Sequence, residues 1–209
     1  FIRRDRPGWR HLDDWDTLGM RASQSCTTVL EGAYAPRDRI VRSLPVGPNP
    51  DLLVFAIFAV FETLLAAVYT GIAERALELG VEAAHRRKSL KNGGRPYSQD
   101  PDIRWQLADA ALALDGVLPH LERVAADVDA LVDRGPAWFP ALSGIKHRAT
   151  ETARAVVDVA MRAGGGAGYF RSHELQRLYR DVLAGLYHPS DPESAHATMA
   201  NALLGPLED

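Results

Sequence analysis

The pattern of apolar and polar positions changes near residue 50 and divides the chain into two regions. After the helix-start signal Asn49-Pro50-Asp51, an apolar run from Leu52 to Ala67 turns into an amphipathic repeat that reaches about Lys88. The most apolar part, up to Phe61, has only about ten residues, fewer than the roughly 20 that span a bilayer. We therefore predict a buried helix of a bundle here, not a membrane span.

The same periodicity predicts four further helices. They cover about 99–134, about 138–163, about 171–186, and a last stretch from Asp191 or Pro192 to about Leu204, with Ser190 or Asp191 as its cap. Pro119 is expected to kink or interrupt the first of these four. Long helices joined by short connections favour a mainly α, up-and-down bundle over residues 49–209.

Residues 1–48 have a different pattern. Proline and glycine recur between short β-branched runs, of which Thr27–Leu30 and Arg39–Val41 are predicted strands. This region is too short to build an independent sheet with a good core. We therefore interpret it as the tail of a β-domain, and Phe1-Ile2 as the end of a strand that begins upstream in a longer gene product.

Composition excludes only a few classes of function and site. The net charge of −3 excludes a general polycation, so nucleic-acid binding is not expected. The single cysteine, Cys26, excludes an internal disulfide and multi-cysteine metal sites, and in a predicted strand it is expected to be inert packing. The histidines form no metal-binding pair, so no metal is expected. No signal peptide is visible, and a cytoplasmic location is the expectation.

Two local features are candidates for binding a phosphate-bearing ligand. The Gly164–Gly168 run lets the backbone approach a ligand closely and expose N–H groups, although a flexible helix linker has the same composition. His85-Arg86-Arg87-Lys88 ends the first long helix. These cations either satisfy the helix terminus or form a diphosphate clamp.

Two residues are candidates for proton chemistry. His188 follows a predicted helix, and histidine exchanges protons near neutral pH. Glu62 stands alone among apolar residues, where it is either a general base or simply paired with an arginine.

Two motifs resemble the acyl-CoA dehydrogenases. The first combines Trp15-Asp16-Thr17-Leu18-Gly19-Met20-Arg21-Ala22-Ser23 with Glu31-Gly32-Ala33-Tyr34-Ala35-Pro36. The second is Gly165-Gly166-Ala167-Gly168-Tyr169 followed by Arg177-Leu178-Tyr179-Arg180-Asp181. The resemblance implies a C-terminal helical bundle preceded by a remnant of the family's β-barrel-like middle domain.

The resemblance also implies a flavin site, with FAD as the expected cofactor. Arg87 falls on the arginine that binds the FAD diphosphate across a subunit interface, and Ser89 falls where the family often has glutamine. The glycine loop covers Gly164, Gly165 and Gly166. Arg162 also replaces a glutamine and either adds a charge near the diphosphate or is simply exposed.

The catalytic base is where this sequence departs from the family. Pro189 stands at the usual glutamate position, and Phe61 stands at the alternative one with Glu62 next to it. His188 resembles the histidine of flavin-dependent monooxygenases of the same fold. The first expectation is α,β-dehydrogenation of an acyl thioester, with Glu62 and His188 as catalytic residues.

The alternative is a two-component monooxygenase that receives reduced FMN or FAD from a reductase. A non-catalytic helical module would leave the glycine run and the arginine cluster unexplained. The expected partners are acyl-CoA or a similar small molecule, and an electron-transfer flavoprotein or flavin reductase. We further expect no membrane partner and a homodimer or homotetramer.

Overall fold

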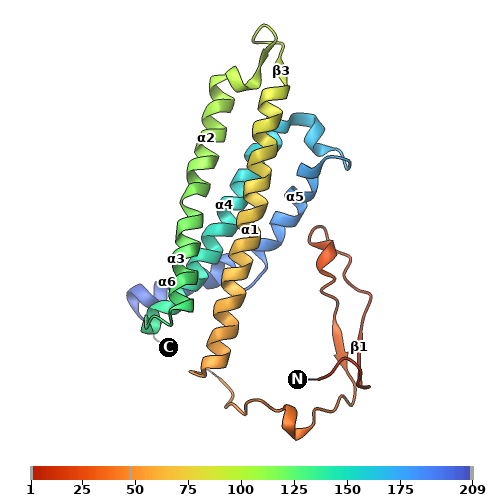
Figure 1. Cartoon of the computed structure of the whole chain (residues 1–209), viewed down its shortest axis with the longest axis vertical. Coiled ribbons are helices and arrows are strands. Elements are labelled where there is room, and N and C mark those ends of the chain that lie inside the picture. The colour runs from red at the N-terminus through yellow and green to blue at the C-terminus, as the bar shows by residue number, and fades with distance from the viewer. Residues whose placement is uncertain (1, 48, 208–209) are drawn as a thin grey trace. The chain divides into compact units, whose positions relative to one another are not determined.

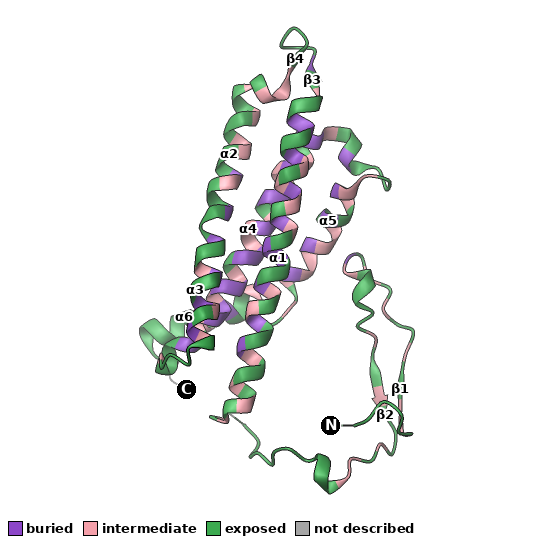
Figure 2. Ribbon diagram, viewed as in Figure 1, coloured by how far each residue is buried: buried purple, intermediate pink, exposed green. Residues whose placement is uncertain are grey.

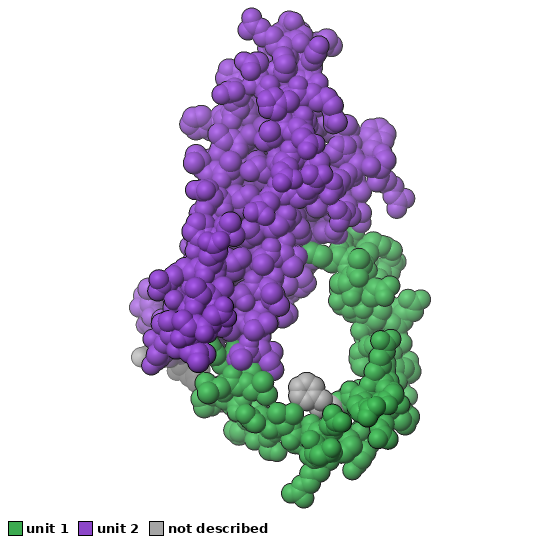
Figure 3. Space-filling view, in the orientation of Figure 1, with its two compact units in different colours: residues 1–55 green, residues 56–209 purple. Residues whose placement is uncertain are grey.

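A computed structural model describes residues 2–47 and 49–207, and its contacts divide the chain into two units, residues 1–55 and 56–209 (Figure 3). Each unit is described by itself. Pro48, which adjoins the predicted domain boundary, lies outside the described residues. The division into domains at 48/49 therefore stays a prediction.

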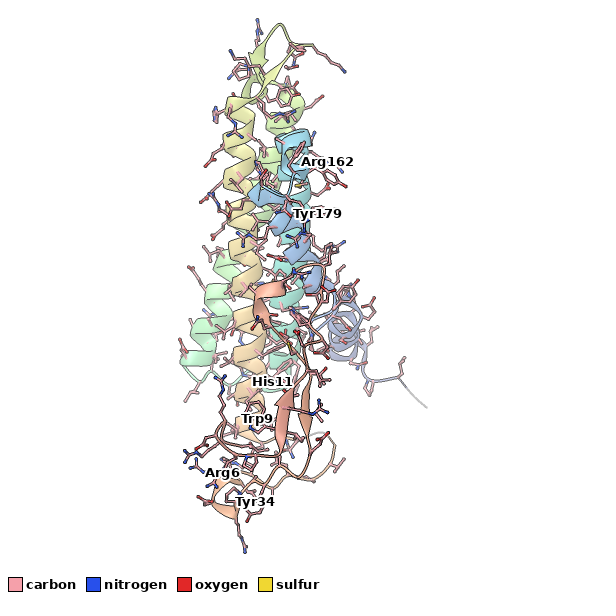
Figure 4. The ribbon with its side chains drawn as sticks, turned by 90° about the vertical axis from the view of Figure 1, so that its right-hand side faces the viewer. Arg6, Trp9, His11, Tyr34, Arg162 and Tyr179 are labelled. Carbon is pink, nitrogen blue, oxygen red and sulfur yellow. The ribbon has the colours of Figure 1, made fainter. Side chains whose placement is uncertain are left out.

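The first unit contains one small antiparallel sheet. Strand β1 (Trp9–His11) pairs with β2 (Thr28–Leu30), with Trp9 opposite Leu30 and His11 opposite Thr28; Figure 4 labels Trp9 and His11 on β1. Among the described residues of this unit only Gly19 is buried. Two strands without a buried face are marginal on their own, as expected for the tail of a larger β-structure.

The second predicted strand is wrong. Arg37–Arg39 forms a 3₁₀ turn, η2, whose N–H groups bond to carbonyls three residues back: Arg39 to Pro36 at 2.8 Å and Ile40 to Arg37 at 3.2 Å. Local turns satisfy this backbone, so no neighbouring strand is needed. A second 3₁₀ turn, η1, covers Arg21–Ser23. Cys26 lies just before β2, not within a strand.

The second unit is the predicted antiparallel helical bundle (Figure 1). Its α-helices are α1 (Leu52–Arg86), α2 (Pro101–Asp115), α3 (Val117–Asp129), α4 (Trp138–Gly164), α5 (Glu174–Val182) and α6 (Pro192–Leu204). Short 3₁₀ segments lie at η3 (Tyr97–Gln99), η4 (Gly135–Ala137), η5 (Gly165–Tyr169) and η6 (Leu183–Leu186), and a hairpin of β3 (Lys88–Ser89) and β4 (Arg95–Pro96) follows α1. Asp191 caps α6 by accepting a hydrogen bond from the Ser194 N–H at 2.7 Å.

The structure corrects the predicted helix over 99–134. It is two helices, and the break lies at Gly116, not at Pro119. Pro119 is the third residue of α3, where a backbone N–H has no partner within the helix, so its missing N–H costs nothing there. Likewise the predicted helix over 171–186 is α-helical only from Glu174 to Val182, and then tightens into η6.

Small residues line the seam on which the bundle is built. Buried positions of α1 repeat with heptad spacing: Ala59, Glu62, Ala66, Tyr69, Ala73, Ala76, Gly80 and Ala83. Buried positions of α4 do the same: Leu142, Lys146, Ala149, Ala153, Val156, Ala160 and Ala163. A Cβ on Gly80 would lie 3.2 Å from the Cα of Ala160. Helices α1 and α4 therefore pack closely, with buried residues on their inner faces (Figure 2).

The N-terminal half of α1 differs from the prediction of a buried helix. An apolar stripe off the seam is exposed, with Ile57, Phe61, Leu64 and Val68 at 41–61% exposure. By length and composition alone, α1 is the one helix of the described residues that is able to cross a membrane, and 22% of its most apolar stretch is buried. Core helices of soluble proteins meet the same criteria of length and composition, so these criteria do not show that α1 crosses a membrane.

We predict that this stripe drives self-association. Two charges introduced by Ile57→Lys and Leu64→Lys should lower the sedimentation coefficient from that of a dimer or tetramer to that of a monomer, because lysine cannot be buried unpaired. Glu74→Lys, on an exposed polar position of the same helix, is the matched control and should leave assembly intact. A wild-type chain that sediments as a monomer at micromolar concentration would contradict the prediction.

Candidate functional site

The bundle brings chemically active residues together at two places, one at each end of the α1–α4 seam. At the C-terminal end of α1, Arg87 meets the glycine run that follows α4. Towards the N-terminal part of α1, Glu62 and Tyr69 meet the turn that carries His188. We describe them as the Arg87 end and the His188 turn (residues 185–191).

At the Arg87 end, the guanidinium is held between a helix terminus and an aromatic ring. Its Nη1 donates to the carbonyl of Ala163 at 2.5 Å, and its Cζ lies 4.5 Å from the centre of the Tyr97 ring. Gly165 packs directly against this guanidinium. A cation at the carbonyl end of α4 complements the helix dipole, so part of this arrangement is helix capping.

The glycine run is not a flexible loop. Gly164 is the last residue of α4, and Gly165–Tyr169 continues as η5. Gly165 adopts φ 59° and ψ −157°, a region that is essentially restricted to glycine. Gly166 has open space, since nothing lies within 4 Å of the position that its Cβ would occupy. A Cβ on Gly164 would lie 2.9 Å from the Leu175 side chain, so its small size serves packing.

The remaining two predicted cofactor residues lie differently. Ser89 is buried in the β3–β4 hairpin, where its Oγ accepts a hydrogen bond from the Asn92 N–H at 3.3 Å. Arg162 is exposed on α4 and pairs with Asp158 at 2.9 Å (Figure 4). The structure thus joins Arg87 to Gly165, while Arg162 stays in solvent and Ser89 serves the hairpin.

In the His188 turn, Glu62 is completely buried. Both the N–H and the Oγ of Ser190 donate to Glu62 Oε1 at 3.0 Å, and Oε2 is buried without a partner among the described residues. Burial raises the pKa of the Glu62 carboxyl, against the Ser190 hydrogen bonds and the charge of Lys146, which lower it. Glu62 therefore holds Ser190 in place, two residues after His188 in the same turn.

Lys146 and Tyr69 complete this network, and the sequence prediction missed both. The buried Lys146 ammonium donates to the carbonyls of Gly185, His188 and Ser190 at 2.9, 2.8 and 2.7 Å. Tyr69 and His188 are hydrogen-bonded between the Tyr69 hydroxyl and His188 Nδ1 at 2.9 Å. The heptad spacing contained a signal for both, because Lys146 occupies a seam position of α4 and Tyr69 lies two turns after Glu62.

The environment of His188 favours its neutral form. Burial, and then the charge of Lys146, lower the pKa of the imidazole from its ordinary 6.5. Burial also raises the pKa of the Tyr69 hydroxyl, with Asp181 adding to the shift, so this phenol stays protonated. The turn therefore holds an uncharged imidazole near two buried ionisable side chains, Glu62 and Lys146.

We predict that Gly165→Ala destabilises the bundle while Gly166→Ala does not. The first change places a Cβ against Arg87 in a glycine-only conformation and should cost about 1–3 kcal/mol. The second meets open space and should stay within about 0.5 kcal/mol of wild type. Urea unfolding of the two variants measures this, and equal midpoints would show that the Gly165 geometry is not required.

We predict that His188 makes folding sensitive to acid. Because its pKa is lower in the folded chain, the unfolded chain binds the proton first, so stability falls as the pH drops below about 6.5. His188→Gln should therefore lose less stability than wild type between about pH 7.5 and pH 5. The exposed His85 supplies the control, since His85→Gln should retain the wild-type loss. Parallel curves for wild type and His188→Gln would contradict this.

Known proteins are similar to this chain in sequence and in fold. Residues 63–190, more than half of the chain, match the family described as acyl-CoA dehydrogenase, C-terminal domain. Amino sugar nitrososynthase DnmZ from Streptomyces peucetius is 34% identical over 190 residues, which cover 90% of this chain and 46% of that protein. The mitochondrial short-chain specific acyl-CoA dehydrogenase of Bos taurus is 29% identical over 189 residues, covering 90% and 43%.

A solved structure shows the same fold. KijD3, crystallised with FMN and dTDP-3-amino-2,3,6-trideoxy-4-keto-3-methyl-D-glucose, superposes with a TM-score of 0.82 and 27% identity over 100% of this chain and 51% of that one. The chain thus spans about half the length of the relatives that it matches. The resemblance expected from the two motifs is confirmed: this chain belongs to the family of acyl-CoA dehydrogenase C-terminal domains.

Proposed function

We propose that this chain is the helical part of a flavin-dependent oxidoreductase, and that it serves the oxygenase of a two-component monooxygenase. A flavin would supply the two-electron redox chemistry. The residues of the Arg87 end fit a flavin phosphate. Arg87 offers further N–H donors beyond the one bonded to Ala163, and Gly166 leaves open space beside it.

The choice of oxygenation over dehydrogenation rests on one observation: Glu62 and His188 differ in their burial and hydrogen bonding. Glu62 is 0% exposed and bonded to Ser190, which is unsuitable for a base that must reach a substrate carbon. His188 is only partly buried, and its Nε2 has no hydrogen bond within the described part of the chain. The likeness to the oxygenase subunit of a flavin-dependent monooxygenase, and to a structure that contains FMN, supports the same choice.

Dehydrogenation of an acyl thioester, the first expectation from the sequence, remains the second candidate. Glu62 Oε2 has no partner among the described residues, and burial raises the pKa of this carboxyl towards the range of a general base. The likeness to an acyl-CoA dehydrogenase supports this candidate. It requires a rearrangement that releases Glu62 from Ser190.

The partners follow from the chemistry chosen. An oxygenase needs a flavin reductase that supplies reduced FMN or FAD. A dehydrogenase instead holds FAD, takes acyl-CoA and passes electrons to an electron-transfer flavoprotein. The exposed stripe on α1 supports a homodimer or homotetramer. A cytoplasmic location remains part of the proposal.

The test is an anaerobic titration of the full-length gene product, loaded with oxidised flavin, with a mixture of acyl-CoAs. We expect the oxidised spectrum to persist, because the buried Glu62 is bound to Ser190 and is not free to remove the α-proton. Bleaching of the flavin would overturn oxygenation in favour of dehydrogenation. In that event Glu62→Gln should abolish the bleaching, while the exposed Glu74→Gln should not.

A further inference from the structure

The backbone of the His188 turn is fixed by a single ammonium group. Lys146 is 0% exposed, and its three N–H donors face three carbonyls, those of Gly185, His188 and Ser190. A lysine ammonium has no further donors to offer, so its hydrogen bonding is complete. The three carbonyls span the end of η6 and the residues on both sides of Pro189. Lys146 therefore determines the path of the segment that carries His188.

A nearby carboxylate, that of Glu62, compensates the positive charge of the buried Lys146. Burial lowers the pKa of the Lys146 ammonium, and the nearby Glu62 carboxylate counteracts this shift. Glu62 binds the Ser190 N–H and hydroxyl, while Lys146 binds the Ser190 carbonyl. The two charges thus hold one residue from opposite helices, α1 and α4. Hydrogen bonds from both helices therefore fix the position of Ser190, and with it the position of the turn.

The imidazole ring is fixed by Tyr69. The Tyr69 side chain is completely buried, and His188 Nδ1 is its hydrogen-bond partner at 2.9 Å. If the buried hydroxyl only accepted a hydrogen bond from the Nδ1–H of His188, its own O–H would have no hydrogen-bond acceptor, which is unfavourable. Tyr69 therefore donates and Nδ1 accepts. The proton of the neutral ring then lies on Nε2, the nitrogen that has no partner in the described part of the chain.

We propose that Lys146 is a positioning residue that, together with Tyr69, sets the backbone and the tautomer of His188, so that His188 presents an Nε2–H donor to an oxygen acceptor of its ligand. The assignment of a ligand at His188 rests on the proposed function. The position and the tautomer rest on contacts within this chain, so they are testable without any flavin.

The experiment is a long-range ¹H–¹⁵N spectrum of the histidine rings in this chain at neutral pH, with the His188 signals assigned through His188→Gln. Wild type should show one His188 species, with Nε2 protonated and Nδ1 free. Lys146→Met and Tyr69→Phe should each lose this single species and show both tautomers. Lys91→Met, a change at an exposed lysine outside the network, should match wild type.

A double variant, Lys146→Met with Glu62→Gln, removes both buried charges and guards against misfolding of the single variant. An Nδ1–H tautomer in wild type, or an unchanged single species in either network variant, would overturn the inference. Failure of both Lys146 variants to fold would also overturn it, because Lys146 would then support the fold and not His188 specifically. A full-length product that binds no flavin would instead contradict the proposed function and leave these spectra unaffected.

Discussion

The close approach of α1 and α4 is the constraint on which the other features depend. Alanine recurs at the seam of both helices, and a Cβ on Gly80 would lie only 3.2 Å from the Cα of Ala160, so a larger side chain there would push the two helices apart. Two helices packed this closely share a narrow apolar interior. Any polar residue on the seam must then find its partner on the facing helix or on the segments that close the bundle.

Polar side chains at the two ends of the seam find their hydrogen-bond partners in different ways. At one end Arg87 follows the last turn of α1 and binds the Ala163 carbonyl near the end of α4, where a positive charge is favoured. At the other end Lys146 and Glu62 are inside the seam and both use the His188 turn as their partner. Removing either side chain leaves buried hydrogen-bonding groups of the turn without a partner, at a cost of roughly 1–3 kcal/mol for each group, which ties the turn to the integrity of the core.

The sequence predicted the bundle well because amphipathic periodicity and breakers act locally. The limits of α1, α4 and α6 and the cap at Asp191 follow from such signals. The break at Gly116 was missed because Pro119 is the stronger breaker in general, yet it is harmless in the first turn of a helix. The strand expected at Arg39–Val41 failed because strand formation needs a partner that a local pattern does not reveal.

The candidate site was predictable only in part, for a related reason. Arg87, the glycine run, Glu62 and His188 each stand out by residue type at one place in the chain. Lys146 does not, because its role depends on three carbonyls that lie about forty residues away. Glu62 was recognised as unusual, but one sequence position does not distinguish a free base from a clamp.

Glu62 has a further consequence for the membrane-like character of α1. It lies near the middle of the apolar stretch that makes α1 resemble a membrane segment. An ionised side chain at the centre of an apolar helix is costly to place in lipid. The carboxylate that anchors Ser190 in the folded bundle therefore also makes α1 a poorer membrane span than its length and mean hydropathy alone indicate.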